Sequence, residues 1–166
     1  MADTSASVDG CVAMITGAGQ GIGRAYALSF AEAGPMREAG CGRIINISSS
    51  TVPQGIPGFT NYVTSKSALI GMTRCMAREL GDANIAVNAV LPGMIETETE
   101  TETETEIEIE NAGRNDAGRA AIISHQSLKR QQEPMDMVGT VLFLSSPTSG
   151  FMTGQSLCVD GGAAFI

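Results

Sequence analysis

The sequence predicts an α/β protein with a parallel β-sheet. Short apolar runs alternate with longer amphipathic runs along the 166 residues, and the first apolar run ends in a cluster of glycines. The apolar runs are rich in Ile and Val, which is typical of strands buried between two layers of helices. With 43% hydrophobic residues in a chain of this length, we expect a single domain over residues 1–166.

Four strands are predicted from the short apolar runs, in the ranges 11–16, 43–48, 85–91 and 157–159. Three helices are predicted between them, in the ranges 22–33, 60–80 and 133–144. In the longest helix, one face carries the apolar residues Leu69, Met72, Cys75, Met76 and Leu80. Gly34-Pro35 is expected to end the first helix and Gly81 the second.

The remaining segments are predicted to be mostly irregular. Residues 49–59 form a loop punctuated by proline and glycine, and 111–130 has weak helical character. Residues 96–110 alternate glutamate with threonine or isoleucine and contribute eight negative charges. Eight carboxylates on one face repel one another, so we interpret 96–110 as a solvated low-complexity insertion, with a calcium-binding ladder as the alternative.

The net charge of −8 comes entirely from residues 96–110, so the rest of the chain is neutral. A neutral body excludes a basic nucleic-acid-binding surface. No apolar run approaches the roughly 18–20 residues that cross a bilayer. Residues 1–10 also lack the basic and apolar regions of a secretory signal, and we expect a cytoplasmic protein without membrane contact.

The four cysteines have no CxxC spacing, and we predict buried, reduced thiols rather than disulfides or metal ligands. His125 is the only histidine of the sequence, which excludes a histidine-based triad or a histidine-rich metal site. We expect its side chain to face solvent or to be satisfied locally.

Residues 16–23, TGAGQGIG, predict a dinucleotide-binding turn between a strand and a helix. Gly17 permits the tight turn, Gly21 lets the backbone approach a pyrophosphate, and Gly23 allows close packing of helix on strand. Backbone N–H groups and the positive end of the helix would then face the phosphates. An incidental glycine turn is the alternative, because glycines alone are a weak signal.

Tyr62 and Lys66 are four residues apart in a predicted helix, so their side chains share a face. The pKa of an isolated tyrosine is about 10, which makes it a poor base at neutral pH. A neighbouring ammonium stabilises the phenolate and lowers that pKa. Ser49, after the second strand, is placed to hydrogen-bond a substrate oxygen. The alternative is a surface Tyr–Lys pair.

The motifs together resemble those of the short-chain dehydrogenase/reductase family in its non-fused, soluble form. The resemblance rests on TGAGQGIG, NISS, YVTSK, NAVLPGMIET and CVDGG in this order, with Ser49 thirteen residues before Tyr62. It implies a Rossmann-like parallel sheet with helices on both faces. It also implies hydride transfer between NAD or NADP and a small secondary alcohol or ketone.

The resemblance further implies the roles of individual residues. Tyr62 would be the general acid/base, Lys66 would lower its pKa and hold the nicotinamide ribose, and Ser49 would position the carbonyl or hydroxyl. The implied cofactor-binding residues are Gly17, Gln20, Gly21, Ile22, Gly23, Tyr62, Lys66, Pro92, Gly93, Ile95 and Thr97. Asn88 would be structural, and no metal ligand is implied.

The chain is truncated relative to the family pattern, because the strands expected after the first βα unit are absent. Residues 35–42 resemble only the tail of the helix that precedes the Ser49 strand. The absent NNAG strand would lie between the first strand and the Ser49 strand, so its loss predicts a gap of one strand or a sheet that re-registers. Crossover handedness predicts that the second strand docks on the wrong side or that the first helix changes faces.

Three interpretations of function therefore stand side by side. The first is an NAD(P)-dependent oxidoreductase. The second is a catalytically inactive family member, either a degenerate product or an assembly subunit that pairs through the Tyr62 helix and the final helix–strand segment. The third is the product of a wrongly joined coding sequence that does not fold stably. The absent segment includes the residue that chooses NAD or NADP, and 96–110 falls in the family's substrate lid.

Overall fold

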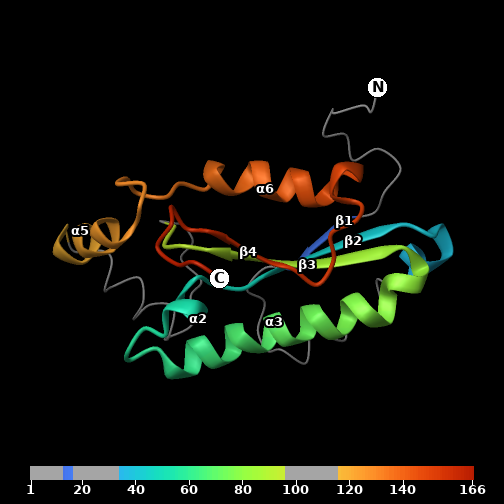
Figure 1. The fold of residues 1–166 in the computed structure, drawn as a ribbon, viewed down its shortest axis with the longest axis horizontal. Coiled ribbons are helices and arrows are strands. Elements are labelled where there is room, and N and C mark those ends of the chain that lie inside the picture. The colour runs from blue at the N-terminus through green and yellow to red at the C-terminus, as the bar shows by residue number, and fades with distance from the viewer. Residues whose placement is uncertain (1–12, 17–33, 96–115) are drawn as a thin grey trace.

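The computed structural model describes residues 13–16, 34–95 and 116–166. Within these residues a parallel sheet carries helix α3 on one face and α6 on the other (Figure 1). Its strands are β1 (Ala13–Thr16), β2 (Gly42–Ile47), β3 (Ile85–Pro92) and β4 (Ser156–Val159), in the spatial order β1-β2-β3-β4. The predicted α/β class and the four predicted strands are confirmed.

The helices are α2 (Thr51–Gln54), α3 (Thr60–Leu80), α5 (Asp116–His125) and α6 (Met135–Ser145), with 3-10 turns at Gly81–Ala83 and Pro147–Ser149. α3 and α6 confirm the predictions for 60–80 and 133–144, and α5 accounts for the helical character of 111–130. The loop predicted over 49–59 contains the single-turn helix α2. The helix predicted over 22–33 lies outside the described residues.

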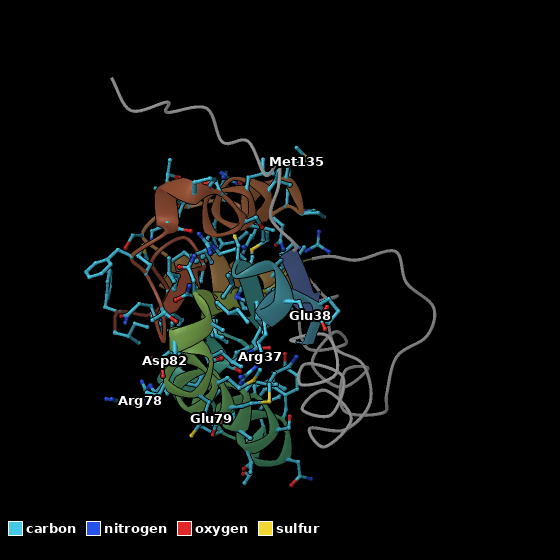
Figure 2. The ribbon with its side chains drawn as sticks, turned by 90° about the vertical axis from the view of Figure 1, so that its right-hand side faces the viewer. Arg37, Glu38, Arg78, Glu79, Asp82 and Met135 are labelled. Carbon is cyan, nitrogen blue, oxygen red and sulfur yellow. The ribbon has the colours of Figure 1, made fainter. Side chains whose placement is uncertain are left out.

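Residues 34–39 are helical, whereas the helix predicted to end at Gly34-Pro35 lies outside the described residues, so its end stays a prediction. Proline is tolerated in the first turn of a helix, where its missing N–H has no helical partner to lose. Met36 of this segment packs against α3, and Arg37 Nη2 donates to the Glu79 carbonyl at 3.5 Å. Figure 2 shows Arg37 on the α3 side of the sheet and Met135, on α6, on the opposite side.

Strands β1 and β2 are direct neighbours, with Ala13 paired to Arg43 and Thr16 paired to Asn46. The sheet has therefore re-registered over the missing strand rather than leaving a gap. Neighbouring strands lie about 4.8 Å apart, so the end of β1 is one strand spacing from β2. Residues 34–39 lie on the α3 face. The helix predicted over 22–33 lies outside the described residues, so the face that it covers stays a prediction.

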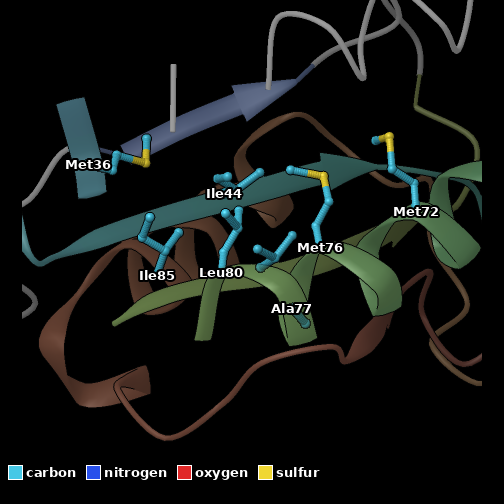
Figure 3. Packing of buried hydrophobic residues seen from close by; sticks show 8 residues of the cluster. Met36, Ile44, Met72, Met76, Ala77, Leu80 and Ile85 are labelled. Atoms are coloured by element: carbon cyan, nitrogen blue, oxygen red, sulfur yellow. The ribbon is translucent and has the colours of Figure 1, made fainter. Parts of the chain in front are cut away.

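The core between α3 and the sheet consists of eight buried residues, Met36, Ile44, Met72, Met76, Ala77, Leu80, Ile85 and Val87 (Figure 3). Met76 and Leu80 are completely buried. Burial of one such side chain contributes about 1.5–3 kcal/mol, so this cluster holds α3 firmly against the sheet. The position of α3 matters because its first turns carry Tyr62 and Lys66.

A second core lies on the other face of the sheet, where Ile45 of β2 and Val90 of β3 pack against Leu144 of α6. Successive strand residues point to opposite faces, so Ile44 and Ile45 enter different cores. This explains why β2 and β3 are buried at nearly every position.

The prediction of buried thiols is wrong for Cys75, which is exposed on α3, while Cys41 and Cys158 are half-buried. Burial raises the pKa of the Cys158 thiol, and the charge of Asp160 raises it further. His125 is exposed at the end of α5, as expected.

Among the described residues, no helix has both the length and the apolar character needed to cross a bilayer.

Candidate active site

The three serines that follow β2 lie at the carboxyl edge of the sheet. Ser48, Ser49 and Ser50 are all buried. The backbone of β3 holds this segment after the strand has ended, because Ser48 N donates to Val90 O at 2.8 Å and Ser50 N donates to Pro92 O at 2.9 Å. Ser49 is therefore fixed beside the end of β3, at the edge where parallel α/β sheets bind their ligands.

The hydroxyl of Ser49 is oriented by Thr51, the first residue of α2. Ser49 Oγ accepts hydrogen bonds from Thr51 N at 3.2 Å and from Thr51 Oγ1 at 2.9 Å. Both bonds use lone pairs of Ser49 Oγ, and a serine hydroxyl also has one hydrogen to donate. The geometry thus suits donation from Ser49 to the oxygen of a substrate.

Tyr62 and Lys66 lie on the same side of α3, one turn apart. The Lys66 Nζ is 5.5 Å from the centre of the Tyr62 ring. The same Nζ donates to the Ile47 carbonyl, the last residue of β2, at 3.5 Å. Lys66 is 8% exposed although it carries a charge. α3 therefore brings a buried ammonium and a phenol to the carboxyl end of β2, from which Ser49 follows.

Gly93, the residue directly after β3, lies close to Gln132, before α6, and to Asp160, directly after β4. Gly93 N donates to Val159 O at 3.1 Å. A Cβ at Gly93 would lie 2.6 Å from Gln132 Oε1 and 3.1 Å from the Asp160 Cα, so only glycine fits. Ile95 then forms an isolated parallel bridge with Gln132. This packing sets the path of the chain toward Thr97, which lies outside the described residues.

The carboxyl-terminal turn, Asp160-Gly161-Gly162, is held by the Asp160 carboxylate. It accepts the backbone N–H groups of Gly162 at 3.0 Å, Ala163 at 3.3 Å and Ala164 at 2.9 Å. Gly161 and Gly162 have φ of 66° and 76°, a region that favours glycine. Sequence reasoning took CVDGG only as part of a resemblance, although an Asp followed by two glycines is itself a turn signal.

Two buried asparagines fasten the strands to their surroundings. Asn88 Nδ2 donates to Met152 O at 2.9 Å, and Asn88 Oδ1 accepts from Gln155 N at 3.1 Å. These bonds fix the turn before β4 and confirm the structural role expected for Asn88. Asn46, which sequence reasoning did not single out, donates to Thr73 Oγ1 at 2.9 Å and ties β2 to α3.

A cavity of about 210 Å³ lies near the end of β4, away from Tyr62, and is lined by Gln126, Leu128, Arg130, Gln132, Asp136, Val159 and Gly161. Arg130 and Asp136 form a bidentate pair at its wall, with N–O distances of 2.7 and 2.6 Å. The hydrogen bonds from Arg130 and from the Glu133 N–H lower the pKa of Asp136 to about 2.

We expect Asp136→Asn to change how stability depends on pH. The folded-state pKa of Asp136 is below its ordinary value of 3.8, so the charged pair stabilises the fold above that value and is lost as pH falls toward about 2. Urea unfolding of the wild type should therefore lose stability between about pH 4 and pH 2 more steeply than Asp136→Asn. Asp82→Asn, on an exposed turn, is the control. Equal pH dependence of wild type and Asp136→Asn would contradict the expectation.

Several predicted site residues, Gly17, Gln20, Gly21, Ile22, Gly23 and Thr97, lie outside the described residues. The described structure places Ser49, Tyr62, Lys66 and Pro92 at the carboxyl ends of β2 and β3, with Gly93 and Ile95 following. Thr16, the last residue of β1, pairs with Asn46, two residues before Ser48. The chain therefore enters the glycine-rich segment from the strand next to β2.

Comparison with known proteins adds to this geometry. Residues 23–164 match the family model described as enoyl-(acyl carrier protein) reductase. The 3-oxoacyl-[acyl-carrier-protein] reductase FabG of Vibrio harveyi is 36% identical over 137 residues, which cover 82% of this chain and 52% of the relative. The short-chain reductase protein NovJ of Streptomyces niveus is 37% identical over 141 residues, 85% of this chain and 52% of NovJ.

Several solved structures have a fold similar to that of this chain. A Beutenbergia cavernae structure described as an NAD(P)-dependent gluconate 5-dehydrogenase with bound NADP has a TM-score of 0.76 at 32% identity, covering 86% of this chain and 53% of the other. A 4-hydroxyisoleucine dehydrogenase complexed with NADH has a TM-score of 0.74 at 35% identity, covering 86% and 56%. The chain spans about half the length of the curated relatives it matches. By its motif order, its fold and these matches, the chain belongs to the short-chain dehydrogenase/reductase family.

Proposed function

We propose that this chain is an NAD(P)-dependent oxidoreductase that interconverts a small secondary alcohol and its ketone. The observation that carries the proposal is the buried Lys66 ammonium, 5.5 Å from the Tyr62 ring and anchored at the end of β2. Burial of a charge costs free energy, and this charge lies beside a phenol at the ligand-binding edge of the sheet.

Each residue of the group has a distinct role in the proposal. Tyr62 donates a proton to the carbonyl oxygen during reduction and accepts it from the hydroxyl during oxidation. Lys66 stabilises the phenolate of Tyr62 through its positive charge. Ser49 donates a hydrogen bond to the same substrate oxygen and holds it near Tyr62, since Thr51 already orients the Ser49 hydroxyl.

The described residues fit the nicotinamide end of NAD or NADP. Lys66 provides an ammonium donor suited to ribose hydroxyls at the carboxyl end of β2. The neighbouring strand β3 ends at Pro92, and Gly93 follows it. The pyrophosphate would be held by the glycine-rich segment that follows β1, directly beside β2. When bound, the cofactor supplies or accepts the hydride.

An assembly subunit is the second candidate, favoured by the outer face of α6. Met135, Val138 and Leu142 lie three and four residues apart on that helix and are 72%, 39% and 44% exposed. Apolar residues at this spacing form one stripe, which suits packing against a second copy of the chain or an intact homologue.

Titration with NADH and NADPH tests the proposal. Binding is followed by cofactor fluorescence, which is free of tryptophan signal because the chain has no Trp. We expect saturable binding of one or both cofactors, and turnover with members of a panel of secondary alcohols and ketones. Saturable binding without turnover would favour the assembly subunit. A folded circular dichroism spectrum without binding of either cofactor would overturn the enzymatic proposal.

A further inference from the structure

Ser48, the residue immediately before Ser49, joins strand β2 to helix α3 through its side chain. Its Oγ donates to the carbonyl oxygen of Lys66 at 2.8 Å. Ser48 is 3% exposed and Lys66 is 8% exposed, so the bond is shielded from water. The residue immediately before the proposed substrate-binding serine is therefore bonded to the backbone of the residue that carries the buried ammonium.

This bond differs from the side-chain bonds to α3 carbonyls that are made within the helix. Ser67 and Thr73 donate to Val63 O at 2.6 Å and to Leu69 O at 2.7 Å, both within the helix itself. Ser48 donates from another element, so its bond constrains where α3 sits on the sheet. The second such link, Asn46 Nδ2 to Thr73 Oγ1, lies about two turns further along α3. Asn46 and Ser48 are two residues apart and share the strand face that points toward α3.

Lys66 is held at both ends by two consecutive residues, Ile47 at the end of β2 and Ser48 directly after it. Its carbonyl accepts from Ser48 Oγ, and its Nζ donates to Ile47 O at 3.5 Å. That second distance is at the outer limit of a hydrogen bond, where about 2.9 Å is usual. A shift of α3 by a few tenths of an ångström away from β2 would therefore break the Nζ bond. The bond from Ser48 resists such a shift at this turn of the helix.

We propose that Ser48 is a positioning residue that fixes Tyr62 and Lys66, on α3, relative to Ser49, on the segment after β2. Ser48 itself does not contact substrate, because its hydrogen is donated to Lys66 O and its side chain is buried. As a statement about catalysis, the inference rests on the proposed hydride-transfer function. As a statement about geometry, it can be tested without turnover.

Ser48→Ala tests the inference, with Ser67→Ala as the matched control. Both variants remove one serine hydroxyl bonded to an α3 carbonyl, but only Ser48→Ala removes a link to β2. In an active enzyme we expect Ser48→Ala to lower kcat about 10–100-fold, since a displacement of about 1 Å at a catalytic group costs about 100-fold. The affinity for NADH or NADPH should remain near that of the wild type, and Ser67→Ala should retain its kcat.

A second measurement separates failure of this inference from failure of the proposed function. The chain has two tyrosines and no tryptophan, so in a Tyr26→Phe background the ultraviolet absorbance of phenolate reports on Tyr62 alone. The Lys66 Nζ lies 5.5 Å from the centre of the Tyr62 ring. We expect Ser48→Ala to raise the pKa of Tyr62 toward that of Lys66→Met, because an unanchored ammonium spends less time near the ring.

The inference is overturned if Tyr62 titrates alike in wild type, Ser48→Ala and Ser67→Ala, or if kcat of an active Ser48→Ala equals that of the control. A wild type without turnover that nevertheless shows the titration shift would remove the proposed function and keep the positioning role. If Ser48→Ala does not fold, Ser48→Cys keeps a side chain of similar shape with a weaker donor, and it should show a smaller shift in the same direction.

Discussion

Replacement of Tyr62 by phenylalanine should lower turnover about 10²–10⁴-fold while leaving cofactor binding nearly intact. That range is the contribution of a positioned general acid or base, and the substitution removes only the phenolic oxygen. The ring remains 5.5 Å from Lys66 Nζ, so the packing around the buried ammonium is preserved. The measurements are initial rates with the best alcohol or ketone of the panel, and cofactor fluorescence for binding.

Tyr26→Phe is the matched control, since Tyr26 and Tyr62 are the two tyrosines of the chain. It should retain the turnover of the wild type, because the proposal gives the Tyr26 hydroxyl no role. Comparable turnover of Tyr62→Phe and Tyr26→Phe would remove Tyr62 from the mechanism. It would also leave the Ser49–Lys66 arrangement without the acid/base that the reaction requires.

Leu80→Ala should lower the free energy of unfolding by about 2–5 kcal/mol, the cost of truncating a buried leucine. Leu80 is fully buried at the end of α3, where it packs in the cluster that includes Ile44 and Ile85 (Figure 3). The total stability of a domain is about 5–15 kcal/mol, so this one change removes a large share. Urea unfolding followed by circular dichroism measures it.

Arg74→Ala provides the comparison within the same helix. Arg74 is exposed, and alanine has the higher helix propensity, so its stability should lie within about 0.5 kcal/mol of the wild type. A small effect of Leu80→Ala, similar to that of Arg74→Ala, would mean that α3 is not packed on the sheet as described. The position of Tyr62 and Lys66 would then be in question as well.

The helix α3 shows which features the hydrophobic periodicity of the sequence predicts. Its bounds, Thr60 to Leu80, agree with the prediction, because the apolar stripe, the proline-rich loop before it and Gly81 after it all indicate the same limits. Cys75 was placed on the stripe but is exposed. At about 100° per residue, Met72, Met76 and Leu80 fall within about 80° of one another, whereas Cys75 lies about 60° beyond Met72 on the other side.

The pairing of the first two strands is a feature that the sequence left undecided. The absent strand allowed either a gap or a re-registered sheet, and composition cannot choose between them. The paired backbone of β1 and β2, with Thr16 beside Asn46, shows that the sheet closed. Unpaired N–H and C=O groups inside a sheet are costly, which favours closure. The same closure brings the strand before the glycine-rich turn next to the strand that carries Ser49.

The sequence by itself determined the class of fold, the order of its strands and helices and the family, because these follow from local periodicity and from short motifs. It also named Ser49, Tyr62 and Lys66 as one group. Only the tertiary structure decided that Ile47 and Ser48 hold Lys66 at both ends, that Gly93 is closed in by Gln132 and Asp160, and that β1 lies against β2. These contacts join residues far apart in the chain, and they depend on how the elements pack once the hydrophobic faces are buried.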